Sequence, residues 1–180
     1  YFIVTSNGED HFVPAGFNRD KVFEIEGRLT QSRCQNGCKA AVYENRDEVL
    51  KMAGAEKGGQ IPTELIPRCS CCGGPVTLNM ADSNSFFQTE QFQKKMKDYQ
   101  NFIKRYHGNK LVILEFGVGW RNRMIKEPFM HLAASEPEST YITFNKGEVY
   151  IPSEIAGRSI GVDGDIGEAL KEIRLAGEII

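Results

Sequence analysis

All five cysteines of the chain lie in the stretch from residue 34 to residue 72. Cys34 and Cys38 form a C-x3-C pair, and Cys69 and Cys72 form a C-x2-C pair followed by Gly-Gly-Pro. About 30 residues separate the two pairs, a spacing that suits two knuckles closing on one tetrahedral ion. Because four thiolates complete the coordination of Zn²⁺, the pattern predicts a structural zinc site with no position for water or substrate.

Cys71 leaves a second ligand set open. It could replace Cys72, but C-x-C spacing makes a poorer knuckle, so we favour Cys69 and Cys72 as the second pair. Two disulfides, or buried free thiols, would be the competing interpretations of this group. Disulfides need an oxidising compartment, and nothing in the sequence indicates secretion, so we favour zinc.

Polar and glycine residues follow each short apolar run of the sequence outside the cysteine region. Asn7 follows the first run, residues 117–120 (Gly-Val-Gly-Trp) a later one, and Asn145 and residues 163–165 (Asp-Gly-Asp) the last two. In a parallel α/β sheet the ligand lies beyond the carboxyl ends of the strands, so these loops predict one binding crevice. Glycines let backbone N–H groups approach a ligand closely, and Asn145 suits a ribose hydroxyl or a base edge.

Each of these residues also has a structural interpretation. Asp163 or Asp165 could bind a ribose, but Asp165 could equally be the N-cap of the last helix. Asn7 lies in a turn, where asparagine is favoured anyway. The Gly-Val-Gly signal is weak alone, because the full dinucleotide-binding fingerprint is absent. Taken together with the cysteine pattern, these loop residues favour a ligand site over separate structural roles.

The elements that must position these residues alternate between strand-like and helix-like patterns. This order predicts an α/β fold with a Rossmann-like, doubly wound parallel sheet. The expected strands are residues 1–5, 21–26, 111–116, 140–144 and 159–162. The expected helices are residues 46–55, 89–107, 124–135 and 166–176.

Three of these expectations concern packing. The apolar and aromatic stripe of helix 89–107 is interpreted as core packing, and the run 111–116 is expected to be covered on both faces. Residues 76–87 look polar and irregular.

The length of 180 residues favours one domain with an insert. We expect residues 1–28 and 81–180 to form the Rossmann-like domain and residues 29–80 to form a small zinc-ribbon insert. The chain opens directly on a strand-like run, and a domain seldom does so. We therefore expect the N-terminal part of the Rossmann-like sheet to be missing from this sequence.

The composition excludes several classes of function. Hydrophobic residues make up 41% and charged residues 26% of the chain, as in ordinary globular proteins. The net charge of −2 gives no footprint for nucleic acid. No apolar run approaches the roughly 20 residues needed to span a bilayer, and no signal peptide is visible. We expect a cytoplasmic protein without a membrane or nucleic-acid partner.

The order of these features resembles the sirtuin family, the NAD-dependent protein deacylases. Residues 5–9 (TSNGE) resemble the family's T-Q-N-I-D stretch, and residues 23–27 (FEIEG) stand at its E-L-H-G stretch. The four paired cysteines match its zinc ribbon, and residues 114–119 stand where the family has a strand ending in G-T-S. Asn145 matches the asparagine before the adenosine site, and Asp163 matches a late acidic residue.

The resemblance implies NAD as co-substrate, a structural Zn²⁺ and a set of site residues. It implies catalytic roles for Asn7, Glu9 and Glu26. The implied NAD-binding residues are Ser6, Asn7, Gly117, Val118, Gly119, Asn145, Lys146, Asp163, Asp165 and Ile166. The family's glycine-rich phosphate loop, which precedes its first matching strand, has no counterpart in this chain.

The departures from the family pattern point to one branch of it. Glu26 stands where the family has its histidine base, and His11 comes too early to replace that base. Glu9 is one methylene longer than the family's aspartate. The Gly-Val-Gly loop is similar to that of the divergent branch found beside macrodomains in microbes, which is associated with protein ADP-ribosylation. This implies a protein acceptor, with a lipoyl-carrier protein as one candidate, and a macrodomain partner.

The residue at position 26 also bears on the chemistry. Both sirtuin reactions break the nicotinamide–ribose bond through an oxocarbenium-like ribose, but deacylation also needs a base such as a near-neutral histidine. A glutamate would oppose the developing positive charge and accept a hydrogen bond from a ribose hydroxyl. Glu26 thus favours ADP-ribose transfer, or NAD hydrolysis. The competing hypotheses are a deacylase, an inactive binding module, and a merely structural Glu26.

Overall fold

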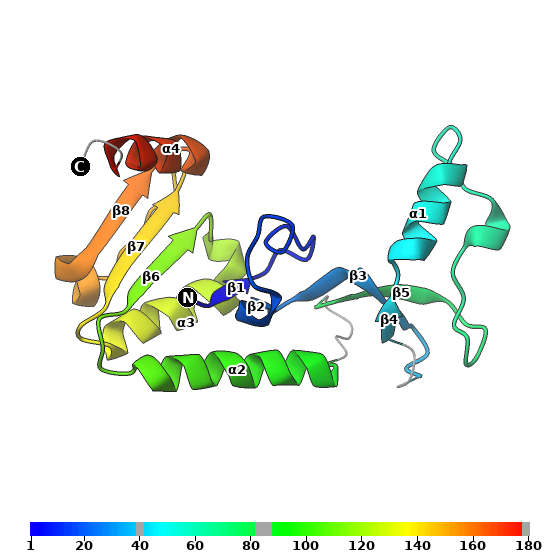
Figure 1. Cartoon of the computed structure of the whole chain (residues 1–180), viewed down its shortest axis with the longest axis horizontal. Helices are drawn as coiled ribbons and strands as arrows, with labels where there is room; N and C mark the ends of the chain where they lie inside the picture. Colours follow the sequence, from blue (N-terminus) through cyan, green and yellow to red (C-terminus); the bar gives the residue numbers. More distant parts are fainter. Residues whose placement is uncertain (39–41, 82–87, 178–180) are drawn as a thin grey trace. The chain divides into compact units, whose positions relative to one another are not determined.

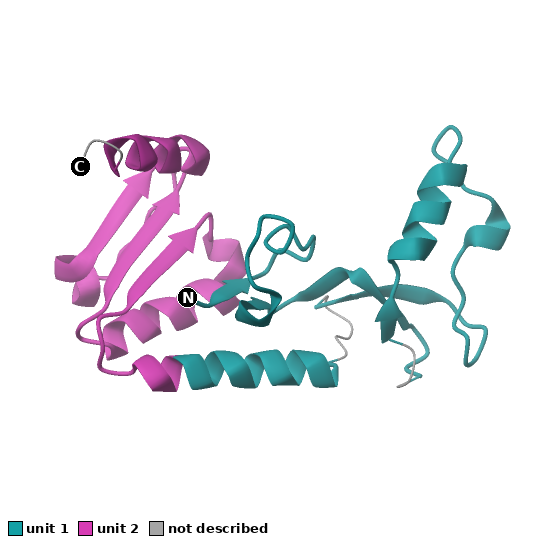
Figure 2. Cartoon of the chain, viewed as in Figure 1, with its two compact units in different colours: residues 1–102 teal, residues 103–180 magenta. Residues whose placement is uncertain are grey.

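The computed structural model describes residues 1–38, 42–81 and 88–177. The chain forms two compact units, residues 1–102 and residues 103–180, shown in different colours in Figure 2. The boundary between the units does not coincide with the expected limits of the insert, which stay a prediction. Within the described residues, no helix is both long enough and apolar enough to cross a membrane.

Unit 1 combines a parallel pair of strands with a three-stranded antiparallel sheet of order β4-β3-β5. Its strands are β1 (Ile3–Thr5), β2 (Val22–Glu24), β3 (Gly27–Cys34), β4 (Val42–Glu44) and β5 (Val76–Met80). Its helices are η1 (Arg19–Lys21), α1 (Arg46–Ala55), η2 (Thr63–Leu65) and most of α2 (Glu90–Tyr106). β1 pairs with β2 in parallel, as neighbouring strands of the expected sheet would. Helix α1 has the predicted bounds.

The strand expected over residues 21–26 ends early and is followed by a strand that was not expected. β2 ends at Glu24, Ile25 and Glu26 form a turn, and β3 starts at Gly27. The φ of Gly27 is +91°, a conformation that glycine adopts readily and that lets the chain turn sharply after an alternating run. Because β3 runs on to Cys34, the expected start of the insert lies inside a strand.

The expected irregular segment 76–87 is also partly wrong. Its first five residues form β5, in which Val76, Leu78 and Met80 alternate with polar residues as strand side chains do. Residues 82–87 lie outside the described residues.

The pairing of β3 with β5 is interrupted by a bulge between Arg28 and Ser32. Asn45, buried at the start of α1, holds the bulged backbone. Its side-chain amide donates to the Leu29 carbonyl and to Ser32 Oγ, each at 3.0 Å, and its N–H donates to the Thr30 carbonyl at 2.9 Å. β3 therefore consists of two separately paired halves.

The aromatic stripe of helix α2, predicted to pack in the core, contacts Phe23 of β2 and Phe2 just before β1, and its members are half-buried or exposed. The rings of Phe92 and Phe23 lie 5.0 Å apart between centroids. Tyr99 and Phe102 lie 5.7 and 5.6 Å from Phe2. Two members of the stripe stay exposed, Met96 and Tyr106.

Unit 2 is a mixed α/β unit built on a parallel sheet of order β6-β7-β8 (Figure 1). Its strands are β6 (Val112–Phe116), β7 (Thr140–Asn145) and β8 (Ser159–Asp163). Its helices are η3 (Trp120–Asn122), α3 (Arg123–Ser135), η4 (Ser153–Arg158) and α4 (Ile166–Gly177). Parallel pairing is confirmed for these three strands and is consistent with a Rossmann-like fold, but β1 and β2 form a separate two-stranded sheet instead of joining one continuous sheet as expected.

One face of this sheet carries the core of unit 2. The core residues are Ile113, Met130, Ala133, Tyr141 and Ile155. On the other face, Val112, Leu114 and Phe116 of β6 are 59, 53 and 43% exposed within the described structure. The expectation that this run is apolar and covered on both faces is therefore wrong here, since Glu115 faces the core and its neighbours do not.

A polar cluster fixes the end of α3. The buried Glu136 carboxylate contacts His107 Nδ1 at 2.7 Å and accepts the Gly108 N–H at 2.9 Å. Arg158 donates to the Glu136 carbonyl at 2.7 Å and to Ser139 Oγ at 2.6 Å. His107, and next the Gly108 N–H, lower the pKa of Glu136, because both stabilise the carboxylate.

The lowered pKa of Glu136 predicts a stability that depends on pH. A carboxyl whose pKa is lower in the folded state stabilises the fold fully above its unfolded pKa and loses this effect as the pH falls. We expect Glu136→Gln to be less stable than the wild type at pH 7. The gap should shrink below the ordinary glutamate value of 4.5. Urea unfolding from pH 7 to pH 3 measures it.

Glu138→Gln is the matched control, since Glu138 is exposed two residues away. A gap between wild type and Glu136→Gln that stays constant from pH 7 to pH 3 would contradict the assignment.

Candidate functional site

The four predicted ligands meet in unit 1. The Sγ atoms of Cys34, Cys38, Cys69 and Cys72 all lie within 4.8 Å of one another. In a tetrahedral zinc site with Zn–S bonds of about 2.3 Å, the sulfurs lie about 3.8 Å apart. The Sγ atoms of Cys34 and Cys72 are separated by 3.6 Å, much longer than a disulfide bond of about 2.05 Å. The donor set thus fits a tetrahedral metal ion.

Strand pairing and two knuckle turns bring the cysteines together. Cys34 ends β3 and pairs with Val76 of β5, which follows the second cysteine pair. In that second knuckle the Cys69 N–H donates to the Gly74 carbonyl at 2.9 Å, and the Gly73 N–H donates to the Cys69 carbonyl at 2.8 Å. Gly73 has a φ of +68°, so the Gly-Gly-Pro sequence serves the turn.

Cys71 is exposed and lies outside this group of four. The side-chain amide of Asn36, which sequence reasoning did not single out, lies 3.6 Å from Cys72 Sγ. A Cβ on Gly74 would lie 3.1 Å from the same sulfur. The Asn36 amide can thus donate to this sulfur, and glycine at position 74 leaves space beside it.

The thiols influence one another strongly. The Cys38 backbone N–H, assisted by contacts with Cys69 and Cys72, lowers the pKa of Cys34 to about 6. Hydrogen bonds with Cys72 and Cys34 raise the pKa of Cys38 to about 12. Four clustered thiols cannot all ionise without a compensating cation, and a divalent ion would supply it.

In unit 2, the loops after β6 and β7 lie against each other. The Gly117 N–H donates to the Phe144 carbonyl at 2.8 Å, and Gly117 has a φ of +65°. The Asn145 side-chain amide donates to the Val118 carbonyl at 3.1 Å. The structure therefore brings Gly117 and Val118 together with Asn145, as the sequence predicted for strand ends of one sheet.

The loop after β8 joins the same edge. Asp163 Oδ1 accepts the Gly147 N–H at 2.7 Å, next to the exposed Lys146. Asp165 Oδ1 accepts the Glu168 N–H at 3.0 Å, so Asp165 is the N-cap of α4, one of the two roles left open for it.

Ile166 lies beside the glycine loop. A Cβ on Gly117 would be 3.4 Å from its Cδ1. All the predicted NAD-binding residues of unit 2 thus lie at or just beyond the carboxyl ends of β6, β7 and β8.

A buried polar network under the glycine loop was not predicted. Lys126 Nζ donates to Glu115 Oε1 at 2.7 Å and to the Val118 carbonyl at 2.8 Å. Tyr141 and Thr143 donate to Glu115 at 2.7 and 2.8 Å. Lys126 is fully buried and Glu115 is 4% exposed. A charged residue inside an apolar strand pattern was the one signal for it in the sequence.

Trp120 lies between this network and the segment after β7 in its contacts. Lys126 Nζ lies 5.7 Å from the centre of the Trp120 ring, and the rings of Trp120 and Tyr150 pack edge to face at 5.0 Å. The Trp120 N–H donates to Glu148 Oε2 at 3.4 Å. Neither Trp120 nor Glu148 was singled out from the sequence as a site residue.

In unit 1, the predicted catalytic residues follow the paired strands β1 and β2. Thr5 pairs with Glu24, and Asn7 and Glu26 each lie two residues further on, at the carboxyl edge of this pair. The Asn7 N–H donates to Thr5 Oγ1 at 3.0 Å, which fixes the turn after β1. Asn7 is exposed and Glu26 is half-buried.

The other two residues predicted after β1 lie in the same turn. Ser6 is half-buried, and Glu9 is exposed with a carboxylate oxygen 3.6 Å from His11 Nδ1.

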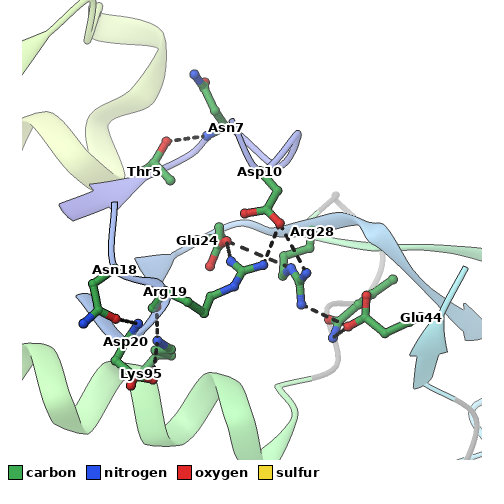
Figure 3. A network of polar contacts seen from close by, with 11 residues as sticks. Thr5, Asn7, Asp10, Asn18, Arg19, Asp20, Glu24, Arg28, Glu44 and Lys95 are labelled. Carbon is green, nitrogen blue, oxygen red and sulfur yellow. Dashed lines mark hydrogen bonds and ion pairs between the residues drawn. The ribbon is translucent and has the colours of Figure 1, made fainter. Parts of the chain in front are cut away.

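An ion-pair network holds the loop after Asn7 to β2 and β3 (Figure 3). Arg19 donates to Glu24 at 2.5 Å and to Asp10 at 2.6 Å. Arg28 lies 3.6 Å from Asp10 and 3.0 Å from Glu44. The Asn7 side chain points away from these charges in Figure 3. The network therefore serves as support for the Asn7 loop.

Comparison with known proteins gives two informative similarities. The chain is 30% identical over 168 residues to a protein ADP-ribosyltransferase of Staphylococcus aureus, covering 92% of this chain and 53% of that protein. It is 28% identical over 180 residues to a probable bifunctional ADP-ribose hydrolase/ADP-ribosyltransferase of Fusarium oxysporum, covering 94% of this chain and 30% of that protein. No protein-family model matches the chain.

The chain thus spans about half the length of the first of these relatives and less of the second. Almost all of it resembles proteins named as ADP-ribosyltransferases, and neither name specifies a sirtuin.

The cysteine cluster predicts how many metal ions each chain binds, and Cys71, which lies outside the cluster, provides the control. We expect the wild-type protein to purify with about one zinc ion per chain, since four thiolates fill its coordination shell. Cys72→Ser should lose most of the metal and lower the thermal stability of the protein, whereas Cys71→Ser should keep both. Elemental analysis and thermal unfolding of the three proteins measure this.

The opposite order, with Cys71→Ser losing the zinc, would show that Cys71 is the fourth ligand. Metal-free wild-type protein that unfolds at an unchanged temperature would contradict a structural role for the ion.

Proposed function

We propose that this chain is part of a sirtuin-type enzyme that cleaves the nicotinamide–ribose bond of NAD and transfers ADP-ribose to a protein acceptor. The observation that carries the proposal is the similarity of 92% of the chain to a protein ADP-ribosyltransferase. The loops gathered at the carboxyl edge of the β6-β7-β8 sheet support it, because such edges bind nucleotides in α/β proteins.

The reaction is a group transfer. The bond between ribose C1′ and the nicotinamide nitrogen breaks, and nicotinamide leaves with the bonding electron pair. C1′ then forms a bond with a nucleophile of the acceptor, which loses a proton. The ribose carries positive charge between these events, so a nearby carboxylate would lower the barrier.

We assign the ADP part of NAD to unit 2. The backbone of Gly117, Val118 and Gly119 would face the phosphates. Asn145 and Asp163 would bind the adenosine ribose through the side-chain oxygens Oδ1 of Asn145 and Oδ2 of Asp163, since the Asn145 amide and Asp163 Oδ1 already serve the loops. The remaining residues assigned to this part are Lys146, Asp165 and Ile166.

We assign the reacting ribose to residues of unit 1. Asn7 would orient the ribose or exclude water, and Glu26 would accept a hydrogen bond from a ribose hydroxyl and stabilise the oxocarbenium-like state. Glu9 and Ser6 would complete the loop around them. The common position of Asn7 and Glu26 beyond the paired ends of β1 and β2 supports this assignment.

The metal would act on structure alone. Zinc held by Cys34, Cys38, Cys69 and Cys72 would have no open position for a ligand, so it would brace the β3-β5 ribbon and take no part in the reaction.

The partners follow from the resemblance and from the names of the relatives. The resemblance to the macrodomain-linked sirtuins favours a protein acceptor, with a lipoyl-carrier protein as one candidate. The Fusarium relative carries ADP-ribose hydrolase in its name, which supports a partner that removes the modification, such as a macrodomain. Deacylation is less well supported, because both relatives are named as transferases and residue 26 is a glutamate.

Incubation of the natural full-length protein with NAD tests the proposal. We expect nicotinamide release and, by mass spectrometry, ADP-ribose on an acceptor protein. Glu26→Gln should reduce turnover on the order of 10²-fold, as removal of a transition-state contact does, with zinc content unchanged. Glu64→Gln, an exposed glutamate of η2, is the matched control.

Each competing hypothesis has its own product. Formation of O-acyl-ADP-ribose from an acylated peptide would identify a deacylase. Absence of any NAD consumption would leave a binding module, and full activity of Glu26→Gln would remove Glu26 from the mechanism.

A further inference from the structure

We propose that Lys126 is a positioning residue for the proposed dinucleotide site: its buried ammonium group fixes the Val118 carbonyl so that the next N–H, on Gly119, faces an oxygen of the pyrophosphate. The proposal rests on the function proposed above for the identity of the ligand. It concerns unit 2 alone and a residue that no sequence pattern indicated.

The charge of Lys126 is buried and paired. Lys126 has no exposed surface, and its Nζ has two acceptors, Glu115 Oε1 at 2.7 Å and the Val118 carbonyl at 2.8 Å. An ammonium group is retained inside a protein only where it is paired and hydrogen-bonded. Glu115 supplies the charge, and the second acceptor is the backbone of the glycine loop.

The Val118 carbonyl is held from two sides. It accepts two hydrogen bonds, from Lys126 Nζ and from the Asn145 amide at 3.1 Å, so it is fixed from the side of α3 and from the end of β7. The described peptide bonds are all trans. In a trans peptide the N–H points opposite to the preceding carbonyl, so the Gly119 N–H is directed away from Lys126.

The glycine loop already contacts a carboxylate. An oxygen of the exposed Glu148 carboxylate lies 3.4 Å from the Trp120 nitrogen and accepts its N–H. A Cβ on Gly119 would lie 2.5 Å from that same oxygen, so a side chain at this position would displace the Glu148 carboxylate. A negatively charged oxygen therefore fits beside Gly119, and the exposed Glu148 carboxylate must move aside before a phosphate oxygen takes this place, because the two anions repel each other.

The support beneath the loop is buried and hydrogen-bonded. Tyr141 and Thr143 of β7 donate to Glu115, and both are fully buried. Burial, followed by the contact with the Glu115 carboxylate, raises the pKa of Tyr141, so its hydroxyl stays a donor. Glu115 cannot turn away from Lys126 without losing these bonds, and the loop is supported by the core.

The test compares ADP-ribose, which carries the pyrophosphate and a second ribose, with adenosine, which lacks both. Lys126→Met alone would leave Glu115 buried without its charge partner, so the double variant Lys126→Met/Glu115→Gln is made beside it to keep the core neutral. Lys171→Met, an exposed lysine of α4, is the matched control. Titration calorimetry of the full-length proteins with ADP-ribose and with adenosine gives the dissociation constants.

We expect the double variant to bind ADP-ribose at least about tenfold more weakly than wild type, the order of effect of one lost hydrogen bond to a charged group. Adenosine binding should change less than twofold. In the enzymatic assay KM for NAD should rise more than kcat falls. Trp120, the single tryptophan of the chain, should become more accessible to acrylamide quenching.

Several results would overturn the proposal. Equal weakening of ADP-ribose and adenosine binding, or unchanged ADP-ribose binding in both variants, would show that Lys126 only stabilises the fold. Wild-type protein that binds neither ligand would refute the dinucleotide site itself, and with it the proposed function. Wild-type protein that binds ADP-ribose but transfers none would refute the proposed function alone, since the binding comparison could still be made.

Discussion

The buried pairing of Lys126 with Glu115 is the interaction on which unit 2 depends. Both charges lie in the core, where an unpaired charge would cost several kcal/mol and removal of one partner typically costs about 3–5 kcal/mol. The pair links α3 to β6, and the hydroxyl groups of Tyr141 and Thr143 extend it to β7. The same ammonium group holds the glycine loop, so the packing of the sheet and the conformation of the candidate site are inseparable.

Unit 1 is stabilised by different interactions, namely aromatic packing, ion pairs near its surface and the cysteine group. Its parallel pair β1-β2 is too short to be stable alone, and helix α2 covers it with aromatic side chains. The loop after β1 is held by two arginines between three carboxylates, with Glu24 nearly fully buried. The cysteine cluster closes the far end of β3 and β5. Ion pairs thus support the loop that carries Asn7, and the cysteine group joins the ends of β3 and β5.

Local signals in the sequence were sufficient for the helices, the parallel strands of unit 2 and the grouping of the cysteines. Helix 46–55 and strands 140–144 and 159–162 have strong periodicity or clear end signals, and the cysteine spacing restricts the geometry directly. The antiparallel β3-β5 ribbon was missed, because Gly27 ends one strand pattern and begins another within a single turn.

Residues of the buried network were missed for a different reason. Glu115 was counted as part of an apolar run, and Lys126 was not singled out within the expected helix 124–135. Their pairing depends on how α3 crosses the sheet, which no local pattern contains. The role of Asp165 was left open for the same reason, since an N-cap and a ribose ligand need the same side chain, and the hydrogen bond to the Glu168 N–H shows only the first.

The bulge in β3 has a consequence for how this protein can vary. Between Arg28 and Ser32 the strand advances four residues while β5 advances one. Hydrogen bonds from Asn45, and not pairing with β5, hold the extra residues in place. Residues inserted or deleted beyond the bulge would be absorbed there without shifting the turn that carries Glu26. We therefore expect homologous chains to differ more in the length of this segment than in the turn formed by Ile25 and Glu26.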